Sequence, residues 1–79
     1  MKWSEMREGV IVRRRGDYAP LLIVGVNIFG DYRIAHNLDA WNHVRVEKSE
    51  CQLYRRIGHI GWKKGAMLVT WDQEEESRE

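Results

Sequence analysis

Cysteine and proline each occur once in this 79-residue chain, and no apolar run is long enough to span a membrane. A lone Cys51 excludes the intramolecular disulfides that stabilise many small secreted domains. The longest apolar run, residues 20–26, is far shorter than the ~18 residues of a membrane helix. Residues 1–4 contain no signal-peptide core. We therefore expect a cytoplasmic protein with one small core and no membrane contact.

Residues that bind metals or perform catalysis are few and widely spaced. The soft metal ligands His36, His43, Cys51 and His59 are seven or eight positions apart, whereas zinc sites usually contain close pairs of ligands. Cys51 and His43 could supply a nucleophile and a base, but the sequence contains no recognisable third orienting group or oxyanion loop. We expect no metal, no cofactor and no enzymatic activity.

Charge is distributed unevenly, although the formal net charge is only +1. Residues 1–71 carry 12 basic and 7 acidic side chains, whereas residues 72–79 carry 1 basic and 5 acidic side chains. The first segment is therefore moderately basic, and we expect it to form a single domain. The second segment contains no apolar residue and repels itself, so we expect a disordered acidic tail.

Most of the chain has the residue pattern of β-strands. Runs rich in β-branched residues, or with alternating polar and apolar residues, are bounded by turn-forming residues. Ser49 and Gln52 have the spacing of a capping box, which predicts one helical turn before the fifth strand. The expected strands cover residues 10–15, 21–29, 32–38, 43–48 and 53–57, followed by a hairpin of residues 57–62 and 66–71. The pattern predicts an all-β fold.

The same periodicity predicts turns and faces. Gly30 and Asp31 stand between two apolar runs and predict a two-residue type II′ turn, because glycine tolerates positive φ at the first central position. Val44 and Val46 are expected to point inward. In the second strand, apolar residues recur at every other position and are expected on one face: Leu22, Val24, Val26 and Ile28.

The order of these elements resembles a small barrel of the Src-homology-3-like type over residues 8–56. Residues 9–16 and 22–26 are similar to the opening of several small bacterial and phage barrels, including KOW-type modules and the plasmid-borne type II dihydrofolate reductases. The resemblance implies a barrel of about five strands with one helical turn, followed here by the C-terminal hairpin and the acidic tail. The reductases build their pore from a Val-Gln-Ile-Tyr stretch. At the comparable place this chain has Val-Arg-Val-Glu, residues 44–47. That departure argues against the reductase activity.

Three basic clusters stand next to aromatic residues. Cations neutralise phosphates and release counterions, while flat rings stack on unpaired bases. We therefore hypothesise a non-enzymatic module that engages nucleic acid or a nucleic-acid-handling complex. If Val10 and Val12 face the core, Arg14 also points inward and must lie at an edge or pair with an acid. The expected phosphate contacts are Arg13, Arg15, Arg55, Arg56, Lys63 and Lys64, and the expected stacking residues are Tyr54 and Trp62.

A second hypothesis is a small protein-binding adaptor or inhibitor, of the compact kind that phages encode. Trp41 and Trp62 lie in expected loops, where large aromatic residues often anchor a partner. An exposed strand edge offers another route, because it can add to the sheet of a partner. Self-association into a homo-oligomer is a related possibility, since a chain of this size gains stability from a second copy.

Overall fold

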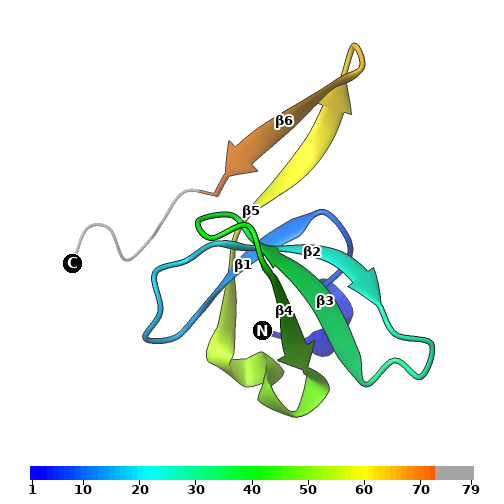
Figure 1. The fold of residues 1–79 in the computed structure, drawn as a ribbon, viewed down its shortest axis with the longest axis vertical. Coiled ribbons are helices and arrows are strands. Elements are labelled where there is room, and N and C mark those ends of the chain that lie inside the picture. The colour runs from blue at the N-terminus through cyan, green and yellow to red at the C-terminus, as the bar shows by residue number, and fades with distance from the viewer. Residues whose placement is uncertain (73–79) are drawn as a thin grey trace.

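The computed structural model describes residues 1–72, which form six strands and two short 3-10 helices. The strands are β1 (Val10–Arg14), β2 (Leu21–Val26), β3 (Tyr32–Asn37), β4 (His43–Glu47), β5 (Tyr54–Lys63) and β6 (Ala66–Trp71), and the helices are η1 (Trp3–Glu5) and η2 (Lys48–Leu53). Figure 1 shows β1 to β4 and the first half of β5 curled around one interior, while the rest of β5 and β6 extend away as a two-stranded ribbon.

All the strands of the described chain belong to one antiparallel sheet, in the order β4-β3-β2-β1-β5-β6. β1 to β4 form a meander, and β5 returns after η2 to pair with the other side of β1. The prediction of an all-β fold with a helical turn before the fifth strand is confirmed. Over residues 1–72 the sheet is open, with β4 at one edge and β6 at the other.

Both faces of β1 are buried. Ile11 and Val12 are neighbours and are each 0% exposed, and successive strand residues point to opposite faces. Ile11 packs with Leu22 and Ile57, on the face that we call the outer face of the sheet. Val12 packs in the main core, inside the curl. The other buried members of the main core are Met6, Leu21, Ile23, Ala35, Val46 and Tyr54.

The face predicted for the second strand is wrong, because a bulge interrupts β2. The pairing with β3 shifts between Ile23 and Gly25, which leaves Val24 as the extra residue. Residues 21–23, before the bulge, are buried. The later members of the predicted face are exposed: Val24, Val26 and Ile28. A bulge breaks the alternation of side chains, so a strict period of two fails beyond this point.

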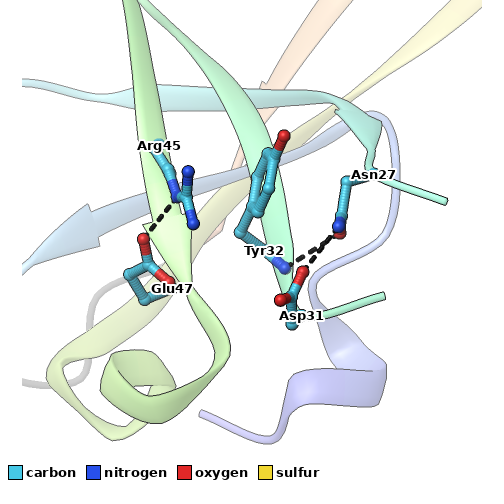
Figure 2. A network of polar contacts seen from close by, with 5 residues as sticks. All are labelled: Asn27, Asp31, Tyr32, Arg45 and Glu47. Atoms are coloured by element: carbon cyan, nitrogen blue, oxygen red, sulfur yellow. Dashed lines mark hydrogen bonds and ion pairs between the residues drawn. The ribbon is translucent and has the colours of Figure 1, made fainter. Parts of the chain in front are cut away.

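The β2–β3 connection is a hairpin, but its loop is longer than the two-residue turn predicted at Gly30 and Asp31. The loop covers residues 27–31. Asn27 closes it, because its side-chain amide donates to Asp31 and its side-chain oxygen accepts the backbone N–H of Tyr32 at 3.0 Å (Figure 2). Gly30 has a φ of +74°, so the positive φ was predicted correctly although the turn type was not.

Arg45 is held on the surface of β4 by two neighbours. Its guanidinium carbon lies 3.9 Å from the centroid of the Tyr32 ring, and it forms an ion pair with Glu47 on the same strand. Figure 2 shows the guanidinium between these two residues. Val44 and Val46 alternate with Arg45 and pack on the main core, as predicted.

The short helix η2 connects β4 to β5, but the predicted capping box is wrong. Glu47 occupies the cap position, and no side-chain hydrogen bond caps this end of the described helix. Ser49 lies inside the helix instead of at its start. The helix is held by packing, since Cys51 and Leu53 are half-buried against the main core.

β5 is one continuous strand of 10 residues, not two adjoining segments. Residues 54–59 pair with β1, and residues 58–63 pair with β6. The predicted C-terminal hairpin is confirmed. Lys64 and Gly65 form its turn with φ values of +54° and +81°, as a type I′ turn requires positive φ at both central positions.

The N-terminal segment closes one end of the main core. Met6 is fully buried. Arg33 of β3 donates from Nε to the Met6 carbonyl at 2.7 Å, and its guanidinium carbon lies 4.2 Å from the Trp3 ring centroid. The Trp3 indole N–H donates to the Gly30 carbonyl at 3.1 Å. These contacts hold η1, which is too short to be stable alone.

Only one residue of the predicted acidic tail, Asp72, falls within the described chain; residues 73–79 lie outside the described residues. The Asp72 backbone N–H donates to the Ile57 carbonyl at 2.9 Å, and its carboxylate lies 3.3 Å from Nε of Arg56. Asp72 therefore continues the pairing of β6 with β5 by one residue.

Candidate functional site

Two of the three predicted basic clusters meet at one place. Arg13 of β1 and Arg55 of β5 are directly opposite each other in the strand register, so their side chains share a face. This is the outer face, because Arg13 is two residues from Ile11. Arg15 follows at the end of β1, where its backbone N–H donates to the Leu53 carbonyl at 2.8 Å.

These cations line a surface hollow of about 490 Å³ between the end of β1 and the η2–β5 junction. The turn after β1 shapes one wall: Gly16 has a φ of +89°, and the Asp17 N–H donates to the Arg14 carbonyl at 2.9 Å. We call this feature the basic hollow. Its exposed or half-buried functional candidates are Arg13, Arg15, Tyr18 and Arg55.

Tyr54 is not available for stacking, which corrects its predicted role. Its side chain is only 5% exposed and belongs to the main core. Burial raises the pKa of its hydroxyl above the ordinary value of 10.0, while a hydrogen bond from Arg14 acts in the opposite direction. Arg14 lies opposite Tyr54 in the register and 3.7 Å from Glu50. The expectation that Arg14 points inward and pairs with an acid is confirmed.

Tyr18 is the aromatic residue that the sequence-based site omitted. It is 90% exposed and lines the basic hollow. An exposed ring beside cations is what base stacking requires. The sequence feature that could have identified Tyr18 is its position just after Arg15 and the turn at Gly16, because a large ring in a polar loop has few core neighbours.

Arg56 does not join this site. It is adjacent to Arg55 in an extended strand, and it is not among the residues that line the hollow. Its Nε lies 3.3 Å from the Asp72 carboxylate, and one terminal nitrogen lies 2.8 Å from Nδ1 of His59. These contacts hold the guanidinium beside the ribbon, so we remove Arg56 from the predicted phosphate contacts.

The third basic cluster lies at the tip of the ribbon. Lys63 ends β5, Lys64 is in the turn, and Trp62 is 71% exposed beside them. Eight positions of extended strand separate Arg55 from Lys63, which corresponds to roughly 26 Å. The predicted convergence of all three basic clusters on one surface is therefore wrong for Lys63, Lys64 and Trp62.

Trp41 forms a separate aromatic feature in the β3–β4 loop. It is 74% exposed and has a positive φ of +60°. Its ring centroid lies 5.2 Å from that of His36, which lies 5.2 Å from His43 on the next strand. Trp41 and Trp62 belong to different hairpins, so each would contact a partner from its own part of the sheet.

Residues 1–72 contain no group of three or more side chains arranged to hold a metal ion. Cys51 packs against the main core, and His59 contacts Arg56. No helix in this part of the chain is long and apolar enough to cross a membrane. Comparisons with protein-family models, curated proteins and solved structures found no match to the chain.

Proposed function

We propose that this chain is a non-enzymatic binding module whose basic hollow engages single-stranded nucleic acid, free or within a nucleic-acid-handling complex. The observation that carries the proposal is the meeting of Arg13, Arg15 and Arg55 around one hollow, with the exposed ring of Tyr18 on its wall. The cations contact consecutive phosphates, and Tyr18 stacks on a base.

The register of β1 and β5 supports an anionic partner. Arg13 and Arg55 are directly opposed in the register, so their two positive charges lie on one face. The turn of Gly16 and Asp17 keeps the hollow open beside Tyr18, so an unpaired base can reach the ring while its phosphate meets the guanidinium groups.

We further propose that the fold is a Src-homology-3-like barrel. Its support is the order of the elements: a four-stranded meander, a 3-10 turn, and a fifth strand that pairs with the first. The C-terminal ribbon is an addition to that plan. In this arrangement the basic hollow lies at one end of the barrel, beside the β1–β2 loop.

The salt dependence of binding tests the function. We expect a fluorescent single-stranded oligonucleotide to bind with a slope of about −2 in log K against log salt, since three phosphate contacts each contribute about −0.7. Arg13→Gln should make the slope shallower by about 0.7. Tyr18→Ala should weaken binding by about 1–3 kcal/mol per stacked base and leave the slope unchanged.

Lys64→Gln is the matched control, because it removes the same charge at the tip of the ribbon. Binding by this variant should equal that of the unmodified chain. A slope near zero, or an equal loss for Arg13→Gln and Lys64→Gln, would show that the basic hollow is not the contact surface.

One observation favours a second candidate, a protein-binding adaptor. Trp41 is 74% exposed although its ring rests on His36, and large exposed aromatic residues are common anchors of interfaces. In this case a protein copurifies from nuclease-treated lysate with the unmodified chain and is lost with Trp41→Ala. Retention by the variant would exclude Trp41 as the anchor.

A further inference from the structure

The ribbon presents a sheet edge that is unusually open to pairing. All six residues of β6 are exposed, none is charged, none is proline, and the pairing with β5 has no bulge. Edge strands of soluble proteins normally carry charges, prolines or bulges that prevent pairing with other chains. The opposite edge, β4, does carry charged residues, Arg45 and Glu47.

The register defines which backbone groups of β6 are available. Lys63 and Ala66 flank the two-residue turn, so the even-numbered residues of β6 exchange hydrogen bonds with β5. The Asp72 N–H, two residues beyond Thr70, follows this rule by donating to the Ile57 carbonyl. The N–H and C=O groups of the odd-numbered residues, Met67, Val69 and Trp71, therefore point to the free edge.

The odd-numbered side chains form one apolar strip. Val69 is paired with Ile60, Met67 with Trp62, and Trp71 with Gly58, and directly paired residues share a face. Because Gly58 also pairs with Ile11, this strip continues the outer face. The edge and the face together offer a partner both hydrogen bonds and apolar contact.

We propose that a second copy of this chain binds here, with the two β6 strands antiparallel and Val69 on the two-fold axis. This register brings Val69 beside the partner's Val69 and Trp71 beside the partner's Met67, so the apolar strips of both ribbons join on one face. Each odd-numbered backbone group then bonds across the interface. A two-fold contact uses both β6 edges and closes, so it forms a dimer instead of a fibre.

Charge supports a second copy in the antiparallel direction. One end of β6 adjoins the basic tip, Lys63 and Lys64, whereas Asp72 follows its other end. Antiparallel pairing brings the basic tip of each copy beside Asp72 of the other. Parallel pairing would place the two basic tips side by side, and repulsion between their lysines disfavours it.

The test is the oligomeric state of the full chain by sedimentation at several concentrations. The unmodified chain should form a reversible dimer. Val69→Lys and Val69→Glu should each raise the dimer dissociation constant by roughly a hundredfold, because like charges meet on the two-fold axis. Val24→Lys is the matched control, since Val24 and Val69 are 42% and 40% exposed, and it should dimerise normally.

Mixing the two Val69 variants tests whether Val69 of one copy faces Val69 of the other. If Val69 faces itself, an equimolar mixture of Val69→Lys and Val69→Glu should form a heterodimer at concentrations where each variant alone is monomeric. Circular dichroism checks that both variants fold, and hydrogen exchange should show Met67, Val69 and Trp71 amides protected only in the dimer. A chain that stays monomeric up to its solubility limit, or a mixture that fails to associate while both variants are folded, would overturn the proposal.

Discussion

Tyr54 shows how one buried polar group couples stability to pH. Its hydroxyl is desolvated in the main core, so burial raises its pKa above 10.0 in the folded state. The unfolded chain loses the Tyr54 proton at lower pH than the folded chain. The resulting contribution to stability is complete below about pH 10 and is lost as pH rises through the folded pKa.

We therefore expect the free energy of unfolding to fall as the solution is taken from about pH 9 to pH 11, and Tyr54→Phe to make that fall smaller. Urea denaturation at a series of pH values measures both. Tyr18→Phe is the control, because the Tyr18 hydroxyl is in water before and after unfolding. An identical alkaline fall in all three proteins would contradict this assignment to Tyr54.

At the same scale, the sequence could indicate the direction of a side chain but not its exposure. Strand alternation predicted that Arg14 points inward and either lies at an edge or pairs with an acid, and in the structure it pairs with Glu50. In the structure Tyr54 lies opposite Arg14 and therefore points inward as well. This pairing is set by the register between two strands that are far apart in the sequence. The sequence therefore suggested Tyr54 for stacking, although Tyr18 is the exposed ring.

At the scale of elements, Gly58 is the point where β5 passes from the body of the sheet to the ribbon. A Cβ at this position would lie 2.6 Å from the Thr70 carbonyl oxygen and 3.1 Å from Cε3 of Trp71. Gly58 is buried between β1 and β6, and it pairs with both Ile11 and Trp71. The close approach of β6 therefore depends on the absence of a side chain here.

Gly58→Ala should destabilise the protein by about 1–3 kcal/mol, because the backbone of β6 must shift to admit the methyl group. Gly61→Ala, three residues along the same strand, has no atom within 4 Å of the new Cβ and should change stability by less than about 0.5 kcal/mol. Urea denaturation of the two variants compares them directly. Equal effects would mean that β6 does not pack on Gly58 as described.

The strands themselves were predictable, whereas their irregularities were not. Alternation and turn residues located every strand to within a few positions, including both strands of the last hairpin. The bulge at Val24 depends on how β2 meets β3, and the five-residue loop after β2 depends on the hydrogen bonds of Asn27. Such features arise from pairing between segments and leave little trace in local periodicity.

At the scale of the whole molecule, the sheet carries two kinds of surface. The basic hollow lies where β1 meets the start of β5, and the basic tip lies at the far end of β5. The apolar strip runs from the tip back to Trp71, which lines a neighbouring hollow together with Arg13 and Tyr18. Figure 1 shows this ribbon extending away from the curled body. Sequence clustering could identify the basic groups, but only the length of β5 shows that Lys63 and Lys64 lie too far from Arg55 to share a surface.

Both proposals can hold in one molecule, because Val69, on the proposed two-fold axis, is not among the residues that line the basic hollow. A dimer would then present two hollows. Because Val69 does not line the hollow and Arg13 is not on β6, we expect Val69→Lys to leave oligonucleotide binding to each chain intact and Arg13→Gln to leave the dimer intact.

The most direct test of the central claim is amide chemical-shift mapping of the full chain during titration with a single-stranded oligonucleotide. We expect the largest shifts at residues 13–18 and 52–55, around the basic hollow, and small shifts at residues 62–68 of the ribbon. Shifts confined to the ribbon or to the loop around Trp41, or no shifts at low salt, would contradict the assignment of the hollow as the nucleic-acid contact.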